Sequence, residues 1–383
     1  MLKSFIPVLL STLPFMGTAT ADCPTEPSAH WQAYVSAFVE SDGRVVDRTD
    51  GGKSTSEGQA YGMFFALVNN DRKTFDKALA WAEKTLAGGD LHKNLPAWLY
   101  GKDRKTGRLR ILDKNPASDA DIWMGYLLIE AARLWVEPTY ERMGRKIIEN
   151  VVKHEVVDMA GLGPMVLPGP HGFVVREAKT WRLNPSYLPL PVLRRLAAEP
   201  ELGPWADIAK NTVRMLVEAA PRGFHGDWIA WDHEDGFMVD PNTGPIGSYD
   251  AIRTYLWAGM THASDPAADA LMRATRGAYE FYSANGEPPE KVDIVTGETG
   301  TNAGPIGFYA ALLPYVERLG DSSEIDKLRA HIDATRDGDL YGEPATYYDQ
   351  NLVLFALGHS DGQYSFDENG RLNTKWSNRC EDR

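Results

Sequence analysis

Three acidic residues stand at the beginning of stretches that are apolar almost all round and have the length of helices. An ionised side chain at the mouth of a buried helix is costly, so its presence favours a chemical role. Carboxyl groups that meet in one cleft suit hydrolysis of a glycosidic bond, where one protonates the leaving oxygen and another group activates water. The residues are Glu57 in the stretch 56–67, Asp119 in 118–135 and Asp250 in 248–257.

The acid and the base of such a reaction need different pKa values. A helix N-terminus stabilises an ionised carboxylate, which suits a base, whereas an acid needs burial and a like-charged neighbour. We expect Asp119 to be that neighbour for Glu57, and Asp250 to stay ionised with Arg253. Ser118 is predicted to cap the helix of Asp119 with its hydroxyl. Helix capping alone is the competing interpretation of each acid, but three such acids before three buried helices favour a common site.

The helices that the sequence predicts alternate between apolar all round and amphipathic. This alternation predicts an all-α fold, an (α/α)6 barrel of about twelve helices with short strands or hairpins in its loops. The inner helices of such a barrel are parallel, so their acidic starts would share one end. A helical solenoid is the alternative, but no fixed repeat period is present. The helices expected besides those three are 27–39, 71–86, 139–152, 187–196, 205–218, 266–283, 305–316, 324–335 and 347–357, with strand-like pieces at 165–175 and 237–239.

Aromatic side chains near these helix starts favour a sugar ligand, because the apolar faces of pyranose rings pack on aromatic planes. Core packing is the competing interpretation for each of them. The residues predicted to bind substrate are Trp98, Asp121, Trp123, Trp181, Tyr187, Tyr249 and Arg253.

Composition limits the partners and the cellular location. The net charge is −13 and no long Lys/Arg cluster is present, which argues against nucleic acid as a partner. Residues 1–21 are predicted to be a signal peptide, with cleavage before Asp22, and 22–383 a single catalytic domain in the periplasm or outside the cell. Lipidation of Cys23 is the alternative. Asp22 argues against it, because a small residue is expected directly before a lipidated cysteine. No later stretch is long and apolar enough for membrane insertion.

Cys23 and Cys380 are the two cysteines of the chain. In an oxidising compartment they predict a disulfide between the ends of the mature chain. A loop of that length would stabilise the fold by up to ~5 kcal/mol in the chain-entropy model.

No metal or other cofactor is expected. The pair Asp119 and Asp121 could bind magnesium in an enzyme acting on phosphorylated substrates, but no basic phosphate-binding cluster accompanies it. The nine histidines form no zinc motif, and no Gly-x-Ser-x-Gly esterase motif is present.

Four motifs, at residues 56–63, 117–121, 184–188 and 248–253, resemble those of glycoside hydrolase family 8, and within it the periplasmic endoglucanases associated with bacterial cellulose synthase. The resemblance implies an (α/α)6 barrel that hydrolyses β-1,4-glucan (cellulose) with inversion, with possible proximity to the synthase. By position, Glu57 resembles the proton donor and Asp250 the base of that family. Asp119 matches an acid that we expect to hold the sugar, and Tyr187 and Arg253 match substrate-site positions.

Two departures from the family pattern, Gly125 and Leu127, concern packing rather than the acids.

Inversion predicts that the carboxyl groups of Glu57 and Asp250 lie roughly 6.5–9.5 Å apart, which leaves room for water. The rival hypotheses are a non-catalytic glucan-binding protein and a hydrolase of xylan or chitosan on the same barrel.

Overall fold

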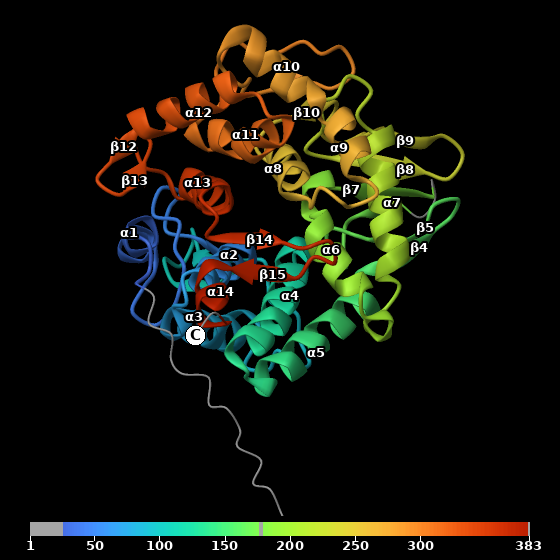
Figure 1. Ribbon diagram of the computed structural model, residues 1–383. Helices are drawn as coiled ribbons and strands as arrows, with labels where there is room; N and C mark the ends of the chain where they lie inside the picture. The colour runs from blue at the N-terminus through green and yellow to red at the C-terminus, as the bar shows by residue number, and fades with distance from the viewer. Residues whose placement is uncertain (1–25, 176–178, 382–383) are drawn as a thin grey trace, which may run out of the picture.

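Six helices form a closed inner ring in the computed structural model, which describes residues 26–175 and 179–381 (Figure 1). Each contacts the next in chain order, and the last returns to the first. The predicted (α/α)6 barrel is therefore confirmed, and closure of the ring excludes the solenoid. The inner helices are α2 (Ser56–Val68), α4 (Ser118–Trp135), α6 (Leu190–Ala197), α8 (Ile252–Met260), α11 (Ile306–Leu319) and α13 (Tyr347–Ser360).

An outer layer of helices surrounds this ring (Figure 1). Helix α3 packs on α2, α5 on α4, α7 on α6, α9 on α8 and α12 on α11, so an outer helix returns the chain between successive inner helices. The described part of the chain has fourteen α-helices, against about twelve expected. The helices outside the ring are α1 (Ala29–Phe38), α3 (Arg72–Trp81), α5 (Pro138–His154), α7 (Trp205–Glu218), α9 (Ala268–Ala274), α10 (Arg276–Asn285), α12 (Ser322–Ala334) and α14 (Lys375–Glu381).

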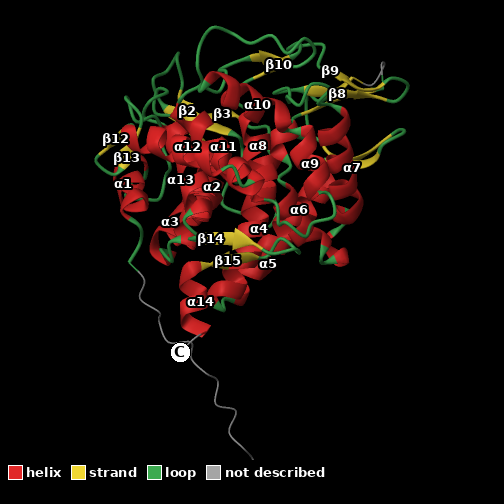
Figure 2. Cartoon of the chain, turned by 45° about the horizontal axis from the view of Figure 1, so that its top comes forward, coloured by secondary structure: helices red, strands yellow, loops and turns green. Residues whose placement is uncertain are grey.

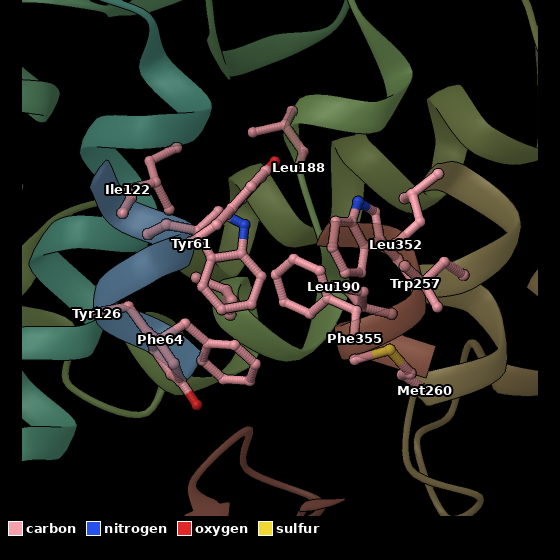
Figure 3. Packing of buried hydrophobic residues seen from close by; sticks show 14 of the residues in the cluster. Tyr61, Phe64, Ile122, Tyr126, Leu188, Leu190, Trp257, Met260, Leu352 and Phe355 are labelled. Atoms are coloured by element: carbon pink, nitrogen blue, oxygen red, sulfur yellow. The ribbon is translucent and has the colours of Figure 1, made fainter. Parts of the chain in front are cut away.

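Aromatic side chains fill the middle of the barrel (Figure 3). Phe355 of α13 packs against Phe64 of α2 at 5.0 Å between ring centroids and against Trp257 of α8 at 5.2 Å. Trp123 and Tyr126 of α4 complete this central aromatic cluster. A core of this kind closes the barrel axis, so a ligand can reach the inner helices only from an end.

Short strands lie at both ends of the barrel (Figure 2). One three-stranded sheet, β1 (Ser54–Thr55), β2 (Leu99–Lys102) and β3 (Leu109–Asp113), leads directly into α2 and so marks the end where the inner helices begin. The other strands pair as β4 (Val156–Met159) with β5 (Gly163–Val166), β10 (Ile246–Gly247) with β11 (Val292–Asp293), β12 (Arg336–Asp337) with β13 (Leu340–Tyr341), and in a sheet of β6 (Val174–Val175), β7 (Thr180–Leu183), β8 (Ile229–Asp232) and β9 (Gly236–Val239).

The hairpin of β14 (Tyr364–Phe366) and β15 (Leu372–Thr374) covers the opposite end (Figure 2). The Tyr126 hydroxyl donates to the Gly370 carbonyl at 3.1 Å, and the Leu372 N–H donates to the Glu130 carboxylate at 3.0 Å. Glu130 also pairs with Arg195 at 2.6 Å, which compensates its full burial. This end is therefore sealed, and the end with the helix starts remains for a site.

Three local predictions were wrong. Ala117, not Ser118, is the N-cap of α4, and the Ser118 hydroxyl is buried without a hydrogen-bond partner in the described chain. The stretch 187–196 divides into the 3-10 turn Pro185–Tyr187 and α6, because Pro189 disfavours helical geometry in the residue before it. The stretch 266–283 divides into α9 and α10, where Gly277 packs against the backbone of Gly223.

The signal peptide 1–21, Cys23 and the side chain of Cys380 lie outside the described residues, so export and the disulfide remain predictions. Within 26–175 and 179–381, no helix has the length and apolar character needed to cross a membrane.

Candidate active site

Glu57 lies in the first turn of α2 and is the one residue of that helix that is partly exposed rather than buried. The Thr55 hydroxyl caps the helix by accepting the Gly58 N–H at 3.1 Å. The Trp98 indole N–H donates to Glu57 Oε1 at 3.0 Å, and the Trp98 carbonyl accepts the Ser56 N–H at 2.9 Å, so the loop before β2 is fixed beside the acid. Burial raises the pKa of Glu57, and the charge of Arg253 and the indole N–H oppose this rise.

Asp119 is almost fully buried in the first turn of α4, at 2% exposure. Its Oδ1 accepts the Ala120 N–H at 2.8 Å, and its Oδ2 has no hydrogen-bond partner among the described residues. Burial, and then the charge of Glu57, raise the pKa of Asp119 well above its usual range. The charge of Glu57 thus acts on Asp119, whereas the rise at Glu57 itself comes from burial rather than from the expected effect of Asp119.

Asp250 lies in the turn just before α8, and its carboxylate accepts hydrogen bonds from two side chains, one of them charged. Arg253 Nη2 donates to Oδ1 at 2.9 Å, and Asn184 Nδ2 donates to Oδ2 at 3.2 Å. The same Arg253 nitrogen donates to the Ser186 hydroxyl at 2.9 Å, and the Ser186 carbonyl accepts the Trp257 indole N–H at 2.9 Å. A network of hydrogen bonds that runs from Trp257 through Ser186 and Arg253 thus holds Asp250, the candidate base, in place.

Arg253 supplies the positive charge of the site. Burial lowers the pKa of Arg253, but Tyr61, Asp250 and Asp119 outweigh burial and keep the pKa well above its ordinary value. The guanidinium is therefore charged at every working pH, and it faces acids from two different inner helices.

Tyr187 shows that the three acids share one end of the barrel. Burial raises the pKa of the Tyr187 hydroxyl far above its usual value, followed by the charges of Asp119, Glu57 and Asp250. Because the fields of all three carboxylates reach this one hydroxyl, residues separated by almost two hundred positions in the sequence meet at one site.

Two of the predicted aromatic residues are exposed beside the acids. Trp98 is 38% exposed and contacts Glu57, while Tyr249, which precedes Asp250, is 42% exposed. The Tyr249 hydroxyl donates to the Glu290 carboxylate at 3.0 Å, which orients its ring. Large aromatic faces open to solvent next to carboxyl groups suit a sugar ligand.

Two further residues predicted to bind substrate, Trp123 and Asp121, are buried, and a third, Trp181, is partly exposed. Trp123 is 1% exposed and belongs to the central aromatic cluster, one helical turn below Asp119. Asp121 is fully buried because it points about 200° around α4 from Asp119, toward α5. Trp181 lies on β7 opposite Trp231, in the sheet of β6 to β9, and packs against the core.

Asp121 and Glu155 form a buried carboxyl pair behind the site. Both residues are fully buried, their side chains contact each other, and none of their four oxygens has another hydrogen-bond partner in the described chain. Burial raises the pKa of each residue well above its ordinary value; Glu155 and Asp119 add to the rise at Asp121. The charges that the described residues place on this pair are those of acids, so the pair is expected to hold at least one proton in the folded protein.

Sequence reasoning did not assign Asn184, Ser186, Glu155 or Asp227 to the site. Asn184 and Ser186 belong to the motif at 184–188 that contains Tyr187, so the motif gave a signal for them. Glu155 ends an amphipathic helix and Asp227 stands in an irregular loop, and neither has a distinctive pattern. In the described ranges, no group of three or more His, Cys, Asp or Glu side chains could hold a metal ion.

A model of glycosyl hydrolases family 8 matches residues 5–362 of the chain. The chain belongs to family 8. The family's relatives include an endoglucanase of Xanthomonas axonopodis pv. citri, 45% identical over 347 residues that cover 90% of this chain and 88% of that protein. An endoglucanase of Salmonella typhi is 38% identical over 385 residues, covering 99% of this chain and 98% of the other.

Solved structures agree with this membership in family 8. The endo-1,4-D-glucanase of Vibrio fischeri has a TM-score of 0.85 at 38% identity, covering 91% of this chain and 99% of that one. A cold-adapted family 8 xylanase, at 14% identity and a TM-score of 0.62, covers 87% of this chain and 85% of its own and shares the fold alone. This family 8 chain is accordingly a glycoside hydrolase, and the barrel by itself does not decide the sugar.

The buried pair predicts a specific pH dependence of stability. The raised pKa of Glu155 makes the folded chain keep a proton that the unfolded chain releases above about pH 4. The contribution of Glu155 to the free energy of unfolding is therefore greatest below that pH and falls as the pH rises toward the folded-state pKa. Glu155→Gln removes one titrating group, so we expect this fall to become shallower, by up to about 1.4 kcal/mol per pH unit.

Urea unfolding of the wild type and the variant between pH 4 and pH 9 measures this difference. Glu149→Gln, on the same helix but paired with Lys146 at the surface, is the matched control and should follow the wild type. Equal slopes for the wild type and Glu155→Gln would contradict the shared proton.

Proposed function

We propose that the protein is an endo-acting β-1,4-glucanase that cleaves cellulose chains with inversion of the anomeric centre. The observation that carries the proposal is the different surroundings of two carboxyl groups at one end of the barrel. Glu57 has a pKa raised by burial, whereas Asp250 is held by Arg253 and Asn184. The names of the relatives, endoglucanase and endo-1,4-D-glucanase, support the choice of glucan.

Glu57 acts as the general acid in this proposal. Burial raises the pKa of Glu57, which favours the protonated form, and in this proposal that proton goes to the glycosidic oxygen as the bond to C1 breaks. The Trp98 indole holds Oε1 of the carboxyl group at 3.0 Å, and the Ser56 hydroxyl donates to Oε2 at a longer 3.4 Å. Asp119, buried beside Glu57, is assigned to holding the sugar at the cleavage point.

Asp250 acts as the general base. It removes a proton from a water molecule that attacks C1 from the face opposite the leaving oxygen, so a β-linkage gives an α-configured product. Arg253 compensates the negative charge of Asp250 and also fixes Ser186, so the carboxylate keeps one orientation. The Tyr187 hydroxyl, which faces all three acids, is placed to orient the water or the sugar.

We also propose that the enzyme is exported and works near a cellulose synthase. The signal-like residues 1–21 and the resemblance of the motifs to synthase-associated endoglucanases support this location. Trimming of a glucan chain as it leaves the cell would place an endo-acting hydrolase there.

Release of reducing sugar from carboxymethylcellulose, xylan and chitosan tests the proposed substrate, and we expect the highest rate with carboxymethylcellulose. In the same assay, Glu57→Gln should lower kcat by about 10²–10⁴-fold, because glutamine cannot donate the proton. Its Kd for cellopentaose, measured by calorimetry, should stay within a few-fold of the wild type.

Glu40→Gln, which affects a surface carboxylate paired with Arg48, is the control and should keep full activity. Turnover retained in Glu57→Gln would remove Glu57 from the mechanism. No sugar release by the wild type from any of the three polymers would favour the non-catalytic glucan-binding hypothesis.

The contact between Trp98 and Glu57 predicts a shift in the pH profile. The indole N–H stabilises the ionised carboxylate and so lowers the pKa of Glu57. Trp98→Phe removes that hydrogen bond, and the alkaline limb of the kcat/KM profile should move up by about 0.5–1 pH unit. Trp135→Phe, which removes an indole hydrogen bond to Asn70 at the other end of α4, should leave the limb in place. An unchanged or downward-shifted limb in Trp98→Phe would contradict the role of Glu57 as acid.

A further inference from the structure

We propose that Asp227 is a positioning residue for catalysis, which holds the turn that carries Asp250 and sets the charge beside it. The proposal rests on the proposed function in one respect, the role of Asp250 as base. Asp227 stands in the loop before β8, more than twenty residues from Asp250 in sequence, and none of the four family motifs includes it.

One oxygen of Asp227 accepts three backbone hydrogen bonds from the turn. Oδ1 accepts the N–H groups of Ser248 at 2.8 Å, Asp250 at 3.0 Å and Ala251 at 2.8 Å. These N–H groups stand at the start of α8, where no preceding helical turn can accept them. Asp227 therefore fixes the backbone on both sides of the Asp250 side chain.

Backbone contacts fix Asp227 itself against this turn. Its N–H donates to the Ile246 carbonyl at 2.8 Å. Gly247 packs directly on the His225 carbonyl, since a Cβ at Gly247 would lie 2.0 Å from that oxygen. The two segments thus move as one unit, and Asp227 cannot shift without moving Asp250.

Accepting the backbone N–H groups at the start of α8 does not require a negative charge on residue 227. Burial, and then the charge of Asp250, raise the pKa of Asp227 to about 6. The described titratable groups whose charges are coupled to that of Asp227 include Asp250, Tyr255 of α8 and Tyr348 of α13, none of which is a cation. His225, two residues away, is buried with its pKa lowered to about 3, so it is neutral. An asparagine would offer the same acceptor oxygen without repulsion, so capping alone does not account for a carboxylate.

The charge has a role in base catalysis. Arg253 contacts Asp250 directly, and full neutralisation by an arginine would make a carboxylate a weak proton acceptor. An ionised Asp227 on the other side of the turn partly offsets that arginine. Below about pH 6 Asp227 takes up a proton, its hydrogen bonds to the turn weaken, and the rate should fall.

Two substitutions separate geometry from charge. Asp227→Ala removes the acceptor, so we expect kcat on carboxymethylcellulose to fall by about 10²-fold, with KM changed less than about threefold. Asp227→Asn keeps the acceptor oxygen and should recover most of that loss at pH 7, but its kcat profile should lack the inflection near pH 6. Hydrogen exchange of the amides of residues 248–251 should be faster in Asp227→Ala.

Asp232→Ala is the matched control. Asp232 also accepts two backbone N–H groups, from Glu234 and Asp235, but in the β8–β9 turn. It should leave kcat and the pH profile unchanged.

An Asp227→Ala variant with kcat within twofold of the wild type would overturn the proposal, and so would an Asp227→Asn profile that retains the inflection near pH 6. If Asp227→Ala does not fold, the profile of Asp227→Asn decides. Wild-type sugar release in the same series tests the proposed function separately. If that release is absent the proposed function fails, and amide exchange in 248–251 still decides whether Asp227 positions the turn.

Discussion

The site depends on how one arginine is shared among several buried carboxyl groups. Arg253 binds Asp250 directly, and its charge also acts on Glu57 and Asp119. Because buried carboxylates cannot all be ionised around one cation, the acids must differ in protonation. The carboxylate in contact with the arginine suits a base, whereas the acids further from it tend to keep protons. The division between acid and base follows from this geometry.

The barrel makes that geometry available. Every inner helix runs in the same direction because an outer helix returns the chain, so the starts of α2, α4 and α8 meet at one end. The central aromatic cluster closes the axis beneath the acids, and the β14–β15 hairpin covers the opposite end. The carboxyl groups next to this aromatic cluster lose contact with water on the side that faces it. This desolvation raises their pKa values.

The sequence predicted the rings and the three acids because both depend on local patterns. Alternation of apolar and amphipathic helices implies inner and outer layers, and the acids precede the most apolar helices. The pattern did not predict that Trp123 and Asp121 are buried, because side-chain direction changes by about 100° per residue around a helix. Glu155 and Asp227 escaped prediction because their partners, Asp121 and the turn at 248–251, are distant in sequence. Contacts of this kind exist only after the chain has folded.

The central claim is that Glu57 and Asp250 act as separate acid and base from opposite faces of the sugar, with water between them. Proton NMR of the anomeric signals during the first minutes of cello-oligosaccharide hydrolysis tests this claim most directly. The account predicts that the α-anomer appears first at the newly formed reducing end and then mutarotates. Initial accumulation of the β-anomer would show retention and would contradict the proposed roles of both residues.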